Sequence, residues 1–233
     1  KMPGLDHRKP ATQQFIQQVQ EYWLHEFRVD GFRYDYAKSL TAQGPDIMGN
    51  LVHQARTSPG CYLIGEYVPE EPQAISQFEM NAAWHPTSSH ALKALTMQGV
   101  NMKYSWADNF EECVRVFDHH AIGYQYASQM INFVESHDEQ RFILDARLAG
   151  YDGAGARPRL ALAATVLMAA PGVPMLYHGQ EFGDSSCRSA NERNPIRWEL
   201  LATEGGKGLM DHYQRLCAIR HAHPALRSET YSF

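Results

Sequence analysis

The spacing of hydrophobic residues changes along the chain, and each change marks an expected element. Apolar residues recur at helical spacing between Pro10 and Arg28, namely Phe15, Val19, Tyr22, Trp23 and Phe27. Proline is favoured at the first helical position, so we expect a helix over residues 10–28.

The next seven residues, VDGFRYD at 29–35, follow the two-residue period of a strand. Phe32 and Tyr34 share one face, whereas Arg33 and Asp35 share the opposite face. We expect the strand to bury Arg33 and Asp35 as an ion pair. Considered alone, such a pair is more often structural than catalytic.

Short apolar runs with the same character return at 60–67, 130–138 and 173–183, and a weaker one lies at 78–85. Helical patterns fall between and after them, at about 46–57, 88–98, 109–118, 157–169 and 207–221. Alternating strands and helices predict an α/β fold with a parallel sheet, either doubly wound or closed as a barrel.

Acidic residues lie at the carboxyl ends of the expected strands: Asp35, Glu66 and Asp138, with Glu181 less clearly placed. In a barrel these ends meet at one rim, where active sites are built, whereas a doubly wound sheet binds ligands in a crevice at its switch point. Crowded carboxylates favour one ionised and one protonated group. Retaining glycoside hydrolysis needs such a pair about 5–5.5 Å apart.

Composition excludes several other classes of protein. The net charge is -5 and no Lys/Arg-rich run occurs, so we expect no nucleic-acid partner. The longest apolar stretch is interrupted by Pro171, Gly172 and Pro174, so we expect no membrane span. The four cysteines have no metal-site spacing, so free thiols are expected. No signal-peptide core begins the sequence. The sequence does not identify the cellular compartment, and the cytoplasm is slightly favoured.

Three segments, GFRYDYAK, GEY and FVESHDEQR, occur in this order and each closes an expected strand. Together with PMLYHGQEFG, they resemble signature segments of the α-amylase family, the retaining (β/α)8 barrels that act on α-glucans. The resemblance runs from about Leu5 to about Leu226. It implies a TIM-type (β/α)8 barrel of which this chain carries only strands four to eight with their helices.

The resemblance also implies roles for the acids. Asp35 would be the nucleophile that attacks the anomeric carbon, and Glu66 would be the general acid and then the general base. Asp138 would bind the sugar ring's hydroxyls. Arg33 would hold Asp35 ionised and oriented, because a nearby opposite charge favours the carboxylate.

Further residues are implied as substrate contacts. His137 would donate a hydrogen bond to the sugar, and Lys38 and Tyr67 would line the leaving-group side. Arg141, which ends the third segment, joins the substrate-binding set. Trp84, beyond a strand end, is the best aromatic candidate for stacking on a sugar, ahead of Tyr104, Trp106 and Tyr124, although core packing is the simpler interpretation.

Two departures from the family pattern matter. The upstream segment, a strand ending in Asp and followed by Asn-His, is absent from the sequence. We therefore expect residues 1–226 to form part of a catalytic barrel completed by upstream sequence, with 227–233 as a tail that would begin a C-terminal β domain. Ser39 stands where many amylases carry His, so no calcium ligand and no cofactor are assigned.

The leading hypothesis is a retaining glycosidase or transglycosidase that acts on α-glucans or oligosaccharides. The alternatives are a non-catalytic sugar-binding or scaffold barrel, an inactive fragment of the enzyme, and an unrelated doubly wound protein. Linkage type, chain-length preference, oligomeric state, and hydrolysis against transfer are not determined by the sequence.

Overall fold

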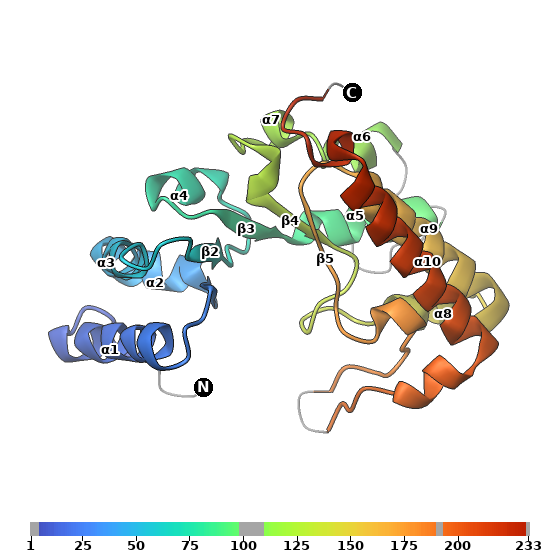
Figure 1. The fold of residues 1–233 in the computed structure, drawn as a ribbon, viewed down its shortest axis with the longest axis horizontal. Coiled ribbons are helices and arrows are strands. Elements are labelled where there is room, and N and C mark those ends of the chain that lie inside the picture. Colours follow the sequence, from blue (N-terminus) through green and yellow to red (C-terminus); the bar gives the residue numbers. More distant parts are fainter. Residues whose placement is uncertain (1–4, 98–109, 190–192, 232–233) are drawn as a thin grey trace. The chain divides into compact units, whose positions relative to one another are not determined.

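The computed structural model describes residues 5–97, 110–189 and 193–231, in which strands and helices alternate (Figure 1). The chain forms two compact units. The first runs to Trp84 and includes Gly123–Gln125, whereas the second contains His85–Ile122 and the chain from Tyr126 onward. Two aromatic candidates, Tyr104 and Trp106, lie outside the described residues.

The strands follow one another in the sheet in their chain order, β1-β2-β3-β4-β5. Their bounds are Gly31–Tyr34, Tyr62–Gly65, Ala82–His85, Met130–Phe133 and Val173–Met175. The pairings of β1 with β2, β2 with β3 and β4 with β5 are parallel. A doubly wound sheet reverses its strand order at a switch point, whereas a barrel does not. The predicted α/β fold with five barrel-type strands is confirmed, and the doubly wound alternative is wrong.

The helices that the periodicity predicted lie within a few residues of the expected positions. They are α1 (Pro10–Glu26), α3 (Pro45–Ala55), α5 (Pro86–Thr96), α6 (Phe110–Arg115), α9 (Gly153–Ala169) and α10 (Glu204–Ala222). Helix α9 begins earlier than expected because Asp152 caps it, its carboxylate accepting a hydrogen bond from the Gly155 N–H at 2.7 Å. No helix among the described residues combines the length and apolar character that crossing a membrane requires.

Four short helices were not predicted: α2 (Ala37–Gln43), α4 (Pro72–Gln77), α7 (His119–Ile122) and α8 (Phe142–Leu148). These segments of four to seven residues contain at most two turns, and none of them carries an apolar repeat that stands out from its surroundings. In the second unit, α5, α8 and α9 nevertheless share one hydrophobic core, to which Leu92, Phe142, Ile143, Leu160 and Leu167 contribute.

The tail after α10 lies against the second unit. The Tyr231 hydroxyl donates to the Phe117 carbonyl at 3.1 Å, and the Ser128 N–H donates to the Glu229 carboxylate at 3.3 Å. The assignment of 227–233 as the start of a further domain stays a prediction, and residues 232–233 lie outside the described part of the chain.

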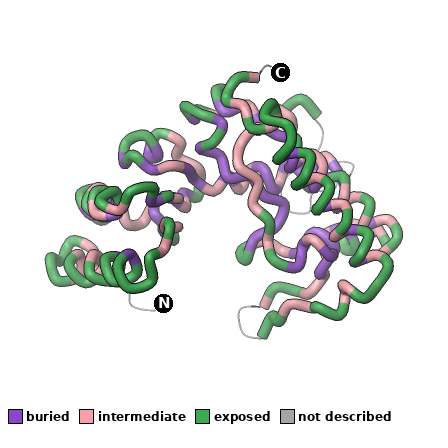
Figure 2. Tube along the Cα trace, in the orientation of Figure 1, coloured by how far each residue is buried: buried purple, intermediate pink, exposed green. Residues whose placement is uncertain are grey.

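Helix α1 leaves most of its apolar residues exposed. The residues of its apolar stripe are exposed, from 41% for Val19 to 56% for Phe15, Tyr22 and Phe27, and Figure 2 shows most of α1 as exposed. The buried residues are Gln20 and Leu24. The prediction of a helix is confirmed, and the described residues leave most of its apolar stripe uncovered.

A polar contact explains which side of α1 packs inward. The Gln20 side-chain amide donates to the Leu51 carbonyl at 2.8 Å and to Gln54 at 2.9 Å, and its oxygen accepts from the Tyr34 hydroxyl at 2.7 Å. These bonds satisfy a buried amide, and they orient α1 toward α3 and β1 with its aromatic stripe turned away.

We expect the 233-residue chain by itself to bind a hydrophobic dye and to self-associate, because the α1 stripe is uncovered. The double substitution Phe15→Lys/Trp23→Lys should reduce dye fluorescence and shift gel filtration toward monomer, with unchanged helical circular dichroism. As the matched control, Leu24→Ala removes a buried side chain and should cost about 2–4 kcal/mol of stability. A cooperatively melting monomer that binds no dye would contradict this expectation.

Candidate active site

Two acidic residues follow the ends of neighbouring strands in the first unit. Tyr34 ends β1 and pairs in register with Gly65, which ends β2. The ladder continues one residue further, since the Glu66 N–H donates to the Tyr34 carbonyl at 3.1 Å. Asp35 and Glu66 therefore lie side by side at the carboxyl edge of the sheet, as the sequence predicted.

Glycine permits the close approach of these two strands. A Cβ on Gly31 would lie 2.0 Å from the Tyr62 carbonyl oxygen, so a larger residue there would push β1 away from β2. A Cβ on Gly65 would lie 2.7 Å from the Tyr67 ring and 2.9 Å from the Met80 sulfur. Both glycines are needed for the register that places Asp35 beside Glu66.

Arg33 joins the two acids. Its Nη1 lies 2.5 Å from Asp35 Oδ1, and its Nη2 lies 2.9 Å from Glu66 Oε2. The guanidinium also stacks on the Trp84 indole, 4.1 Å from the ring centroid. Trp84 lies within β3, so its predicted position beyond a strand end is wrong. A planar guanidinium suits this arrangement because its nitrogens diverge in one plane while its face remains free for an aromatic ring.

Glu66 receives a second contact from the backbone. The Tyr36 N–H donates to Glu66 Oε2 at 2.6 Å, and Tyr36 has a positive φ of 44°. Left-handed backbone is uncommon for a residue other than glycine, and such residues gather at functional sites. The turn after β1 thus aims a backbone donor at the acid that follows β2, a contact that no side-chain pattern could have predicted.

The expected burial of the Arg33–Asp35 pair is wrong. The Asp35 side chain is 77% exposed in this structure, whereas those of Arg33 and Glu66 are 23% and 12% exposed. Asp35 stands one residue beyond the strand, so its carboxylate emerges at the edge instead of inside the sheet. Because the Asp35 carboxylate is exposed to solvent, its ion pair with Arg33 contributes little to folding stability. The same exposure makes the carboxylate accessible to a ligand.

The two candidates for the leaving-group side, Lys38 and Tyr67, differ in their exposure to solvent. Lys38, in α2, contacts the Glu71 carboxylate and is partly exposed. Tyr67 is 1% exposed within the first unit, and its hydroxyl has no hydrogen-bond partner among the described residues. Burial raises the pKa of the Tyr67 hydroxyl. Tyr67 is therefore buried in this structure, and a substrate contact for it stays a prediction.

In the second unit, strand β4 ends earlier than expected. Its pairing with β5 stops at Phe133 opposite Met175, so residues 134–138 form a loop and Asp138 lies five residues beyond the strand. The strand ends there because β5 also ends there, at Met175. Glu181 likewise lies beyond β5, in the short helical turn Gln180–Phe182. Asp138 and Glu181 therefore do not close strands, contrary to the prediction.

Side-chain bonds replace the ladder in the loop after β4. Buried Glu135 accepts the Phe142 N–H at 2.8 Å and the Arg141 Nη1 at 3.1 Å. Burial raises the pKa of Glu135, and Arg141 opposes that rise. Arg141 also lies 3.7 Å from the buried Asp184 carboxylate and 4.1 Å from the centroid of Tyr177. The guanidinium of Arg141 is thus already engaged by neighbours within its own unit.

Asp138 itself is about half-exposed, at 46%. Its Oδ2 lies 3.2 Å from His137 Nε2, and its Oδ1 lies 3.2 Å from Arg188 Nη2. The sequence did not single out Arg188, because it belongs to the irregular loop after β5 and has no periodic or motif context.

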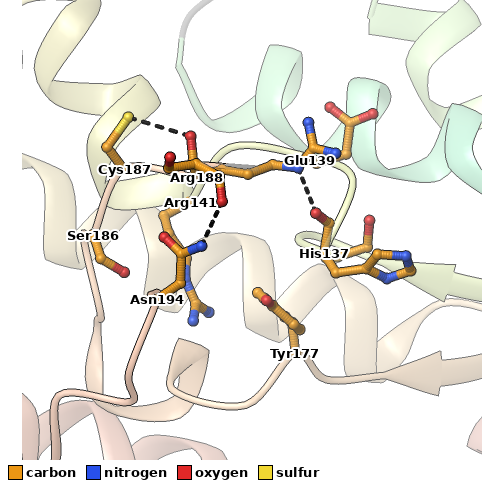
Figure 3. Close-up of a pocket in the computed structure, with 10 residues that line it drawn as sticks. His137, Glu139, Arg141, Tyr177, Ser186, Cys187, Arg188 and Asn194 are labelled. Carbon is orange, nitrogen blue, oxygen red and sulfur yellow. Dashed lines mark hydrogen bonds between the residues drawn. The ribbon is translucent and has the colours of Figure 1, made fainter. Parts of the chain in front are cut away.

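A cavity of about 210 Å³ opens beside this loop. Figure 3 shows it between the loops after β4 and β5, with polar side chains from both. Its lining consists of Ser136, His137, Glu139, Arg141, Tyr177, Ser186, Cys187, Arg188, Ser189 and Asn194. Hydroxyl, amide, imidazole and guanidinium groups beside an aromatic ring suit a polyhydroxylated ligand.

The predicted site residues thus form two groups. Arg33, Asp35, Glu66 and Trp84 meet in the first unit, whereas His137, Asp138 and Arg141 share a loop in the second. The convergence of all three acids on one pocket stays a prediction. Ser39 accepts a hydrogen bond from Gln43 at 3.1 Å, and among the described residues no group of three or more His, Cys, Asp or Glu side chains is arranged to hold a metal ion.

The unreversed order of parallel strands and the acids directly after β1 and β2 define a protein of the (β/α)-barrel class with an acidic carboxyl edge. The family model described as alpha amylase, catalytic domain, matches residues 1–204. The chain therefore belongs to the α-amylase catalytic-domain family.

The similar proteins are longer than this chain. A cyclomaltodextrinase of Bacillus sp is 26% identical over 234 residues, covering 100% of this chain and 39% of that protein. An intracellular maltogenic amylase of Bacillus subtilis is 25% identical, covering 98% and 36%. The native structure of the Nostoc punctiforme debranching enzyme aligns with a TM-score of 0.81 at 21% identity, covering 99% and 47%. The chain thus spans less than half the length of these relatives.

The contacts of Gly65 give a test of how the first unit holds its acids. Gly65→Ala should cost about 1–3 kcal/mol of stability, because the added methyl meets the Tyr67 ring and Met80. Tyr67→Phe removes a hydroxyl that lacks a partner among the described residues and should change stability by less than about 0.5 kcal/mol. Urea unfolding measures the free energy of unfolding of both variants. A loss above about 0.5 kcal/mol in Tyr67→Phe would show that the hydroxyl has a partner.

Proposed function

We propose that the protein to which this chain belongs is a retaining enzyme that cleaves α-glucosidic bonds of α-glucans or oligosaccharides by double displacement. The observation that carries the proposal is the pair of acids, Asp35 and Glu66, at adjacent strand ends on one guanidinium. Sharing Arg33 keeps the two carboxylates close, which favours the short separation of retaining over inverting enzymes.

The contacts suggest which oxygens react. Arg33 engages Asp35 Oδ1, which leaves Oδ2 to attack the anomeric carbon while the bond to the leaving oxygen breaks. The Arg33 ion pair and the Tyr36 N–H hydrogen bond both engage Glu66 Oε2, so Oε1 is the oxygen that carries the proton to the leaving group. Glu66 Oε1 then takes a proton from water or an acceptor hydroxyl, whose oxygen displaces Asp35 and restores both acids.

The other residues support this reaction. Arg33 neutralises charge beside the nucleophile, and the Trp84 indole under the guanidinium fixes its plane. Asp138 and His137 bind sugar hydroxyls from the loop after β4. Arg141, held by Glu135 and Asp184, shapes that loop from within. Lys38 and Tyr67 serve the leaving-group side.

We further propose that strands one to three of the barrel come from sequence outside this chain. Strand β1 lies at one end of the strand order, and the apolar stripe of α1 is uncovered by the described residues. Both features suit another βα segment packing there, and the relatives contain more than twice the length of this chain. We expect the protein in the cytoplasm, in keeping with the name of its intracellular maltogenic relative.

Substitution of the two acids in the complete protein tests the mechanism. Asp35→Asn should lower kcat by several orders of magnitude, because the amide is a poor nucleophile. Glu66→Gln should lower kcat about 10²–10⁴-fold on unactivated glucans, and much less on an aryl α-glucoside whose leaving group needs no proton. The matched control, Glu21→Gln on the exposed side of α1, should retain activity.

The stereochemistry of the first product separates this mechanism from its alternatives. Proton NMR of early hydrolysis should show the α-anomer. A β-anomer would contradict double displacement. Undiminished activity of Asp35→Asn would remove the assignment, and an inactive complete protein that still binds maltooligosaccharides would support the non-catalytic barrel.

The contact of Trp84 with Arg33 gives a second test of the site. Trp84→Ala should lower kcat about 2–30-fold, because a cation–π contact worth about 0.5–2 kcal/mol no longer fixes the guanidinium. Trp84→Phe, which retains a ring, should lose less. If Trp84 instead stacks on the sugar, steady-state kinetics should show a raised KM with an unchanged kcat.

A further inference from the structure

Arg188 ties the loop after β5 to the loop after β4 by three contacts. Its Nε donates to the His137 carbonyl at 2.5 Å, and its Nη2 donates to Asp138 Oδ1 at 3.2 Å. Its backbone N–H donates to Gln140 Oε1 at 3.1 Å. Figure 3 shows the Arg188 side chain reaching toward His137 along the edge of the pocket.

The geometry uses features that only arginine has. Nε and Nη2 form one edge of the guanidinium, and this edge contacts the carbonyl of residue 137 and the carboxylate of residue 138 together. An ammonium group could approach one of these acceptors without reproducing the pair. The contact therefore sets the direction of the Asp138 carboxylate relative to its own backbone.

Asp138 needs such support because regular structure does not hold it. Strand β4 ends at Phe133, and in the loop that follows the Glu139 N–H donates to the Ser136 carbonyl at 3.3 Å. The Asp138 N–H donates to Ser136 Oγ at 3.1 Å, and His137 contacts Oδ2. Arg188 supplies the contact to this carboxylate from a different segment of the chain.

We propose that Arg188 is a positioning residue for Asp138 that holds its carboxylate toward the sugar hydroxyls. This inference rests on the proposed function, because it assumes that Asp138 binds substrate. The side chains of Arg188 and Asp138 are 47% and 46% exposed, so their ion pair contributes little to folding stability. Orientation of a substrate-binding group, in contrast, affects the rate strongly.

The test compares Arg188→Ala, Arg188→Gln and Arg188→Lys in the complete protein, assayed on aryl α-maltosides. Arg188→Ala and Arg188→Gln should lower kcat/KM about tenfold or more, while the thermal midpoint shifts by less than about 2 °C. Arg188→Lys should recover only part of the loss. The matched control is Arg197→Ala, which breaks an exposed ion pair with Glu199, 3.1 Å long, further along the same segment, and it should leave kcat/KM unchanged.

A double-substitution cycle separates positioning from simple loop anchoring. If Arg188 acts through Asp138, adding Arg188→Ala to Asp138→Asn should change kcat/KM by less than about twofold. Effects that multiply in full, or Arg188 variants with wild-type kcat/KM, would overturn the inference. Should Arg188→Ala fail to fold, Arg188→Gln, which keeps most of the stem, provides the same comparison.

Failure of this inference can be told apart from failure of the proposed function. If Asp35→Asn is inactive while the Arg188 variants match the wild type, only the role of Arg188 is rejected. If Asp35→Asn retains full activity, the proposed function itself fails, whatever the Arg188 variants do.

Discussion

The contact on which the first unit's site depends is the bridge that Arg33 makes between Asp35 and Glu66. It exists because β1 and β2 pair in parallel with Tyr34 opposite Gly65, which brings the two following acids to the same edge. A shift of one residue in this register would turn the side chains to the other face. Gly31 and Gly65 permit the register, since a side chain at either position would collide with its neighbours.

The second unit holds its candidate acid differently, because Asp138 lies in a loop and not at a strand end. Buried Glu135 and Arg141 anchor the beginning and the end of that loop, and Arg188 reaches Asp138 from the next loop. The buried pair, Glu135 and Arg141, stabilises the loop, whereas the half-exposed pair, Asp138 and Arg188, remains accessible to a ligand. This division agrees with a site that must be held firmly yet remain open.

Membership of the α-amylase family connects these local observations. The matched residues, 1–204, contain every candidate site residue, and the relatives extend well beyond the length of this chain. The aromatic stripe of α1 is left uncovered by the described residues, which is the feature behind the proposal that further βα segments pack there. The fold class was predictable because its signals are local: strand and helix periods, and short motifs at expected strand ends.

The sequence by itself determined the family, the order of the strands and the positions of the helices with a clear apolar repeat, since periodicity and motifs are properties of neighbouring residues. It also singled out Asp35, Glu66 and Asp138 as candidates, whose roles stay a prediction. Only the tertiary structure decided that Asp35 is exposed, that Trp84 stacks on Arg33, that Tyr67 is buried, that β4 stops at Phe133 and that Arg188 contacts Asp138. Each of these depends on contacts between residues distant along the chain. Such contacts follow from packing and strand register, which no local pattern of residue types encodes.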